Sequence, residues 1–143
     1  MLGFDLKTAK GMFFDRAAVL AKVDGATRRV LSKFGAFVRQ RAKSSIRKRR
    51  AISEPGQPPS SHVGLLKRLI FFAFDPNRKS VVIGPTLLRP GSKAPKLLEH
   101  GGDTTFDTAK GKQPARYRPR PFMGPAFAAE EPRLPDLWKN SVK

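Results

Sequence analysis

The sequence has no cysteine, and only one tryptophan, one tyrosine and two histidines among its 143 residues. The absence of cysteine excludes a disulfide framework, a thiolate zinc site and a cysteine nucleophile. Acidic residues are also scarce, eleven against twenty-nine Lys and Arg, and their scatter leaves little material for paired-carboxylate catalysis. Glu99, His100 and Asp103 are close in sequence, but clusters of this kind are usually surface residues. No nucleophile elbow, phosphate-binding glycine loop or zinc-protease motif is present. The sequence therefore predicts a protein that is not an enzyme and that holds no metal or cofactor.

Long hydrophobic runs are missing as well. The longest wholly apolar run, Leu69–Phe74, is far too short to cross a bilayer, and residues 1–11 lack the apolar core of a secretory signal. We therefore expect a soluble protein made in the cytoplasm, with no membrane partner. A chain of 143 residues with 39% hydrophobic content and eleven Phe predicts a single domain, 1–143, with a real core. The net charge of +18 exceeds what solubility requires, and it favours polyanions or a place among other chains whose surfaces compensate it.

The most prominent pattern is a long basic amphipathic helix predicted over residues 12–50, after a short lead-in at 1–11. Its apolar stripe recurs at three- and four-residue steps, at Val23, Val30, Phe34, Phe37 and Val38. After Val38 the stripe fades, and residues 28–50 carry ten positive charges and no negative one. We expect the first half to bury against the chain's own core. The second half is expected to need a neighbouring subunit or a nucleic acid, or to face only water.

The basic second half of this helix is the main candidate site. Its side chains could neutralise several phosphates in a sequence-independent, salt-sensitive contact, or dock on an acidic protein surface. The simpler alternative is that the charges only face solvent, because most runs of charged residues in proteins form a solvated surface. No helix-turn-helix, RNA-recognition or zinc-finger pattern accompanies the charges, so sequence-specific reading is not predicted. The candidate DNA or partner contacts are Arg39, Arg41, Lys43, Arg47, Lys48, Arg49 and Arg50.

A β-hairpin is predicted over Leu69–Ile83, inside a sheet region at residues 65–122 that follows a Pro-, Gly- and Ser-rich loop at 51–64. The turn signal Asp-Pro-Asn-Arg at 75–78 separates its two strands. Alternation in the first strand places Leu69, Phe71 and Ala73 on one face and Ile70, Phe72 and Phe74 on the other. Both faces are apolar, so we expect both to be covered. The flanking residues are apolar and not basic, which favours packing or assembly over base stacking for Phe71, Phe72 and Phe74.

The rest of the chain contains shorter elements. Residues 96–100 are long enough for one or two helical turns, and residues 103–118 are read either as a loose hairpin or as a mobile loop. Arg120, Pro121 and Phe122 lie in a segment that the prolines hold extended, with Phe122 expected as an anchor beside the long helix. A C-terminal helical segment follows at 123–143, interrupted by two prolines. The predicted fold class is α+β: a long N-terminal helix packed on a small antiparallel sheet, with a short C-terminal helix.

Several stretches, taken in order, resemble one protein family. The ordered patterns are a G-x-L strand start, V-x-I-G, E-x-G and R-P-F-x-x-P-A, together with a P-G-x-P-P loop. The stretches that carry them are Arg41–Ile46, Pro55–Pro59, Gly64–Ile70, Val81–Pro85, Ala94–Gly102 and Arg120–Ala126. In this order they look like the neck or tail-completion (head–tail joining) proteins of long-tailed bacteriophages and prophages. The family usually has an aromatic residue at the position of His100, and an unbroken helix where Pro132 and Pro135 stand.

The resemblance implies a structural virion protein that assembles in the host cytoplasm. It implies a homo-oligomeric ring of six- or twelve-fold symmetry in the neck at the head–tail junction, around a channel that DNA traverses. The implied partners are other copies of the chain, other neck proteins, portal-adaptor proteins and tail-tube proteins. The alternative interpretation is a free-standing, non-specific basic DNA-binding protein.

Overall fold

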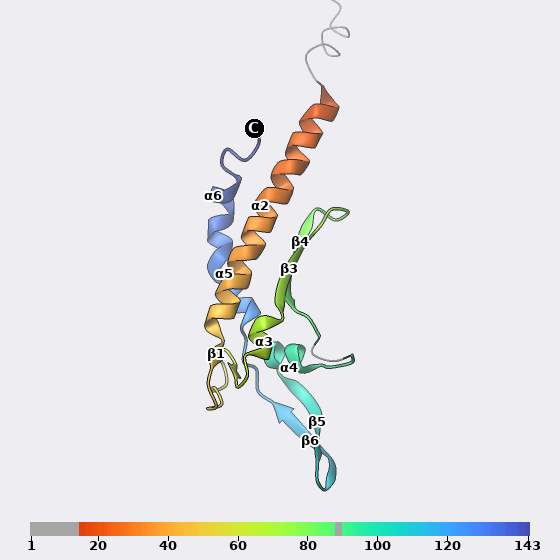
Figure 1. The fold of residues 1–143 in the computed structure, drawn as a ribbon, viewed down its shortest axis with the longest axis vertical. Helices are drawn as coiled ribbons and strands as arrows, with labels where there is room; N and C mark the ends of the chain where they lie inside the picture. Colours follow the sequence, from red (N-terminus) through yellow and green to blue (C-terminus); the bar gives the residue numbers. More distant parts are fainter. Residues whose placement is uncertain (1–14, 88–89) are drawn as a thin grey trace, which may run out of the picture.

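The computed structural model describes residues 15–87 and 90–143, and it has the α+β class expected from the sequence (Figure 1). The lead-in at 1–11 and the first positions of the expected helix lie outside the described residues. The strands form three two-stranded sheets, ordered β1-β2, β3-β4 and β5-β6. The elements are α2 (Arg16–Ser45), β1 (Arg47–Lys48), β2 (Ser60–Ser61), α3 (Leu65–Arg68), β3 (Ile70–Asp75), β4 (Ser80–Pro85), α4 (Ala94–His100), β5 (Gly102–Thr108), β6 (Gly111–Tyr117), α5 (Met123–Glu130), the 3-10 turn η1 (Glu131–Arg133) and α6 (Leu134–Trp138).

Helix α2 is shorter at its basic end than the sequence predicts. It starts at an Asp15 cap, whose Oδ1 accepts the N–H of Ala18 at 3.0 Å. It ends at Ser45, so the expectation that residues 47–50 are helical is wrong. Ile46 is extended, with ψ of 114°, and its side chain is fully buried in the core. The hydroxyl of Ser45 also donates to the carbonyl of Ala42 at 2.8 Å, a local bond that competes with the helical pattern. Burial of Ile46 therefore turns the chain out of the helix, although the arginines that follow are good helix formers.

The buried part of α2 also differs from the expectation. The covered stripe comprises Ala26, Val30, Phe34, Gly35, Val38 and Ala42, in the middle and second half of the helix. The first turns, residues 16–24, are exposed throughout, including Val23 of the predicted stripe. The expectation that the first half is buried and the second half bare is therefore wrong. The sequence stripe continues through both parts, but the hairpin and the C-terminal helices lie only alongside the later one (Figure 1).

The predicted hairpin is present as β3 and β4, which pair antiparallel with Phe72 opposite Ile83 and Ala73 opposite Val82. Its inner face, made of Ile70, Phe72, Phe74, Val81 and Ile83, packs on α2. The approach is close at one point. A Cβ added at Gly35 of α2 would lie 2.8 Å from Cγ2 of Val81 and 3.0 Å from Cδ2 of Phe72. Glycine at position 35 therefore permits the contact between helix and hairpin.

Residues 103–118, left open by the sequence, form a second antiparallel hairpin, β5–β6, with a turn at residues 109–110. It projects from the body of the molecule (Figure 1), and its base is fixed by the N–H of Arg120, which donates to the carbonyl of Leu98 at 2.6 Å. The loop expected at 51–64 contains the short strand β2. That strand pairs in parallel with β1, so that Arg47 lies opposite Ser60.

The C-terminal segment is more continuous than its two prolines suggest. Pro132 and Pro135 each fall at the second position of their element, η1 and α6, within a first turn where the missing backbone N–H is tolerated and the fixed φ suits a helix. The start of α5 is capped from a distance by the Glu99 carboxylate, which accepts the N–H groups of Phe122, Met123 and Gly124 at 2.7–3.0 Å. The regular helix ends at Trp138, before the predicted end of the segment.

One buried cluster joins these elements. It draws on α2, the residue after it, α3, β3 and the start of α5, so each element contributes side chains to the same core. Its members are Phe34, Val38, Ala42, Ile46, Leu66, Ile70, Phe122 and Ala126.

Candidate functional site

The seven candidate basic residues divide into two groups in the structure. Arg39 and Arg41, on the packed part of α2, contact other parts of the same chain. The Nε of Arg39 donates to the carbonyl of Ile70 at 2.8 Å, and its guanidinium lies 5.9 Å from the ring centroid of Phe71. Lys43 is half-buried in the last turn of α2. Arg39 and Arg41 are therefore engaged within the chain, whereas the four basic residues beyond the helix are exposed.

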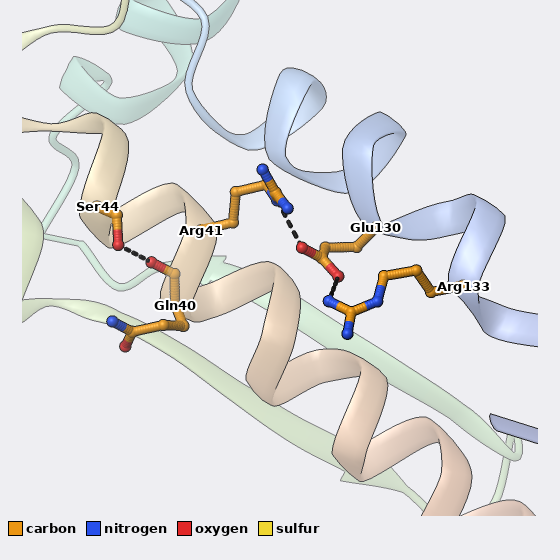
Figure 2. A network of polar contacts seen from close by, with 5 residues as sticks. All are labelled: Gln40, Arg41, Ser44, Glu130 and Arg133. Carbon is orange, nitrogen blue, oxygen red and sulfur yellow. Dashed lines mark hydrogen bonds and ion pairs between the residues drawn. The ribbon is translucent and has the colours of Figure 1, made fainter. Parts of the chain in front are cut away.

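Arg41 belongs to an ion-pair network around a buried carboxylate (Figure 2). Its Nε lies 2.5 Å from Oε1 of Glu130, while an amino nitrogen of Arg133 lies 2.9 Å from Oε2 of the same carboxylate. Glu130 is 3% exposed, so the carboxylate is nearly removed from water. The network joins α2 to the end of α5 and the adjoining 3-10 turn. Its geometry indicates that Arg41 holds the C-terminal helices in place.

The pKa of Glu130 is lowered from its ordinary value. The hydrogen bond from Arg41 is the main cause, and the bond from Arg133 and the two positive charges act in the same direction, whereas burial opposes them. The carboxylate therefore stays ionised and makes a poor general acid. Sequence reasoning missed this residue, because its two partners lie 89 and 3 positions away and the distant one could not be identified from spacing.

The second group, Arg47–Arg50, follows the end of α2 and is defined here as the basic segment. All four residues are exposed. The Nε of Arg49 donates to Oγ of Ser60 at 2.9 Å, and the pairing of β1 with β2 holds Arg47 and Lys48 in an extended conformation. Among residues 15–87 and 90–143, no ion pair involves the basic segment. Its positive charge is therefore available to a partner.

The three candidate phenylalanines of the hairpin lie on opposite faces, as their alternation predicts. Phe72 and Phe74 face α2 and are half-buried. Phe71 lies on the other face, next to Ala73 and opposite Gly84, and is 48% exposed. Together with Val82, which is 66% exposed, it makes an apolar surface that we call the outer face: Phe71, Ala73 and Val82. The sequence predicts a cover for this face, and residues 15–87 and 90–143 do not supply one.

The candidate anchor segment runs from the second hairpin into α5. Phe122 is 1% exposed and belongs to the main cluster beside α2. The Nε of Arg120 donates to the carbonyl of Ser53 at 2.9 Å, and its guanidinium lies 5.3 Å from the ring centroid of Tyr117. Pro121 connects them and is half-buried. These contacts attach the loop at 51–64 and the C-terminal helices to the same core.

The described residues offer little else that could carry chemistry. They contain no group of three or more His, Asp or Glu side chains arranged to hold a metal ion, and Glu99 is engaged as a helix cap. A hollow of about 800 Å³ lies between α4 and β5, and of its lining residues only Lys93 and Asp103 carry charge. Within the same residues, no helix has both the length and the apolar character needed to cross a membrane.

No protein-family model matches the chain, and comparison with curated proteins and with solved structures likewise finds no significant similarity. What the chain does must therefore be argued from its own surfaces.

Proposed function

We propose that this chain is a structural protein of a tailed bacteriophage. In this proposal, copies assemble in the neck at the head–tail junction into a ring of six or twelve subunits, and DNA passes through it. Its other partners are neck, portal-adaptor and tail-tube proteins. The proposal starts from the ordered motif resemblance between Arg41 and Ala126, and it is supported by apolar surfaces that the described part of the chain leaves uncovered.

The observation that carries the proposal is the outer face of the β3–β4 hairpin. A two-stranded sheet is marginal in water by itself, and the packing of the inner face on α2 stabilises this one. The outer face receives no such cover from residues 15–87 and 90–143. Apolar side chains on the outer face, Phe71 and Val82 above all, stand in solvent. Contiguous exposed apolar surface of this kind marks interaction sites. An assembly protein has a use for such a face, whereas a free-standing monomer gains nothing from it.

The charge of the chain suits the same role. A ring around DNA brings many basic chains close together, so its channel must hold a polyanion or its rims must meet acidic proteins. The basic segment, Arg47–Arg50, is exposed at the end of α2 and supplies four positive charges to either partner. We favour assembly as its main role, because the resemblance is to joining proteins.

A non-specific DNA-binding protein remains the second candidate function. The observation in its favour is the exposure of all four side chains of the basic segment, without ion pairs in the described chain. Contacts of that kind neutralise phosphates and lose affinity steeply with salt. They require no assembly and no cover for the outer face.

One experiment distinguishes the two candidate functions. The purified chain, free of DNA, is analysed by light scattering after size exclusion at about 0.15 M and about 1 M salt, where the screening length falls from about 8 Å to 3 Å. A closed oligomer that persists at high salt, and that appears as a ring in electron micrographs, is expected for the neck protein. A monomer whose one strong interaction is salt-sensitive DNA binding would overturn the proposal and favour the second function.

A further inference from the structure

The first turns of α2 carry an apolar stripe that the described chain does not cover. Val19, Leu20 and Val23 are 43%, 48% and 39% exposed. Val19 and Val23 lie on the side of the helix that continues into the buried residues Ala26 and Val30, and Leu20 flanks them. Figure 1 shows why: α2 extends beyond the tip of the β3–β4 hairpin and beyond the C-terminal end of the chain. The apolar stripe therefore extends beyond the elements that cover the rest of α2.

The outer face of the hairpin is the matching uncovered surface. Phe71 and Ala73 are two residues apart on β3, about 7 Å along the strand. Val19 and Val23 are four residues apart on α2, about 6 Å along the helix. The two surfaces are therefore of similar length, and each presents a few apolar side chains. The inner face of the same hairpin already packs on a helix stripe of this kind, that of α2 in its own chain.

Charge distinguishes the uncovered turns from the rest of α2. The surroundings of the outer face are basic, with Arg39 beside Phe71 and Arg78 at the hairpin turn. Lys79, also at that turn, is paired within its own chain, since its Nζ lies 2.6 Å from Oδ1 of Asp24. Residues 28–50 carry ten positive charges and no negative one, so that part of a second α2 would be repelled. Residues 15–24 contain two acidic and two basic residues, and adding Lys79, the partner of Asp24, brings their net charge only to +1. The uncovered turns are therefore the part of α2 that Arg39 and Arg78 of a second copy repel least.

We propose that the uncovered stripe of α2, Val19, Leu20 and Val23, packs on the outer face of the β3–β4 hairpin of a second copy of this chain. The inference rests on the proposed function, and it names the two surfaces that meet between neighbouring copies. The contact is heterologous, because each copy offers one surface and receives the other, and such contacts generate a ring when the rotation closes. The seated helix makes the hairpin the middle layer between two helices, which covers both apolar faces.

The lack of cysteine in the chain permits a direct test by crosslinking. Two single variants, Val23→Cys and Val82→Cys, are oxidised separately and as an equal mixture at about 10 μM, well below the millimolar effective concentration of a seated pair. The mixture is expected to give disulfide-linked dimers at least about tenfold above either variant alone. A mixture of Val23→Cys with Ile52→Cys is the matched control, since Ile52 is an exposed apolar side chain in the loop after β1, at the opposite end of α2 from the uncovered turns (Figure 1).

Three outcomes overturn the inference. Dimers of Val23→Cys alone, as abundant as in the mixture, would indicate a symmetric helix–helix contact. A salt-resistant oligomer without the mixed crosslink would place the contact elsewhere while leaving the proposed function standing. A chain that stays monomeric under all conditions would overturn both.

Substitution gives an independent readout. Leu20→Gln combined with Val23→Gln keeps the helix but removes the apolar stripe, and assembly is expected to weaken at least about tenfold. The control Ile52→Gln should assemble like the original chain. The thermal melts of both monomers are expected to be unchanged, because the substituted side chains are exposed. Undiminished assembly of the double variant would reject the contact.

Discussion

Oε2 of Glu99 accepts the backbone N–H of Phe122 at 2.9 Å, although the two residues are 23 positions apart. The same carboxylate accepts the N–H groups of Met123 and Gly124, so one side chain satisfies three donors at the start of α5. A negative charge at a helix N-terminus also interacts favourably with the helix dipole. Glu99 is thus the N-terminal cap of a helix that the local sequence leaves uncapped.

Replacing Glu99 should therefore loosen the C-terminal helices. We expect Glu99→Ala to lower the free energy of unfolding by about 2–3 kcal/mol, because three donors lose a charged acceptor. Limited proteolysis should show faster cleavage in the region C-terminal to Gly111. Glu54→Ala, at an exposed carboxylate, is the control. Equal urea midpoints for the two variants would show that the cap contributes no net stability.

Two glycines of α2 should respond in opposite directions to alanine. Gly25→Ala is expected to stabilise the chain by up to about 1 kcal/mol, because only the flexible end of Arg29 lies near the added methyl. Gly35→Ala should destabilise it by about 1–3 kcal/mol, because the methyl would clash with Val81 and Phe72. Thermal melts of both variants test this. Stabilisation by Gly35→Ala would mean that the hairpin does not approach the helix so closely.

The hairpin phenylalanines should separate folding from assembly. Phe72→Ala is expected to cost about 2–4 kcal/mol, because the ring packs between the sheet and α2. Phe71→Ala should leave the melting temperature of the monomer nearly unchanged and should reduce oligomer formation, since its ring lies on the outer face. Light scattering and melts on both variants distinguish the effects. A large loss of monomer stability in Phe71→Ala would contradict the assignment of faces.

Glu130 should make stability depend on pH. Its pKa is lowered in the folded chain, so its ion pairs contribute stability above the ordinary glutamate pKa of about 4.3. That contribution is lost as the pH falls through the lower, folded-state pKa. The difference in unfolding free energy between the original chain and Glu130→Gln is therefore expected to be about 1–3 kcal/mol at pH 7 and to shrink below about pH 4. Urea titrations across this range measure it.

The control for this pH effect is Asp136→Asn, which removes an exposed ion pair with Lys139. Its difference should stay near zero throughout, since surface pairs contribute little. A pH-independent difference for Glu130→Gln would show that packing, not charge, accounts for the loss.

The basic segment should bind polyanions without supporting the fold. Replacing Arg47, Lys48, Arg49 and Arg50 with Gln is expected to change stability by less than about 0.5 kcal/mol per position, because all four are exposed. If the segment contacts DNA, the slope of log affinity against log salt should fall by up to about 3–4 units. If it docks on an acidic neck protein, DNA binding should hardly change while head–tail joining fails. An unaltered slope with normal joining would mean that the charges are merely solvated.

The sequence predicted what local patterns determine. Strict alternation and the turn residues after Phe74 located the first hairpin and assigned its faces, and the long helix followed from its stripe. It misplaced the end of the helix, because the burial of Ile46 depends on side chains of α3 and β3. It also assigned the bare half of α2 wrongly. Val23 and Val30 look alike in sequence, and only the reach of the hairpin and of the C-terminal helices distinguishes them.

The candidate site was predictable only in part. Exposed charges at Arg47–Arg50 could be recognised from composition, whereas the use of Arg41 could not, since its partner Glu130 lies in another helix. Pro132 and Pro135 predict helix breaks, because local rules do not show that each lies in the first turn of a new helical element. Long-range polar pairs and the order of helical segments thus fall outside what spacing reveals.

The clamp at the base of the β5–β6 hairpin has a consequence for engineering. The N–H of Arg120 donates to the carbonyl of Leu98, and the N–H of Phe122 donates to the Glu99 carboxylate. These hydrogen bonds hold the two ends of the hairpin together whatever the length of the segment between them. Extra residues at the exposed turn, Ala109 and Lys110, add mainly loop entropy, about 0.6 kcal/mol for each doubling. An epitope or a fluorescent label inserted at this turn would sit at the end of a stalk, away from α2 and from the outer face. The turn of the β5–β6 hairpin is therefore a suitable insertion site for a tag, because it lies away from both the uncovered stripe of α2 and the outer face.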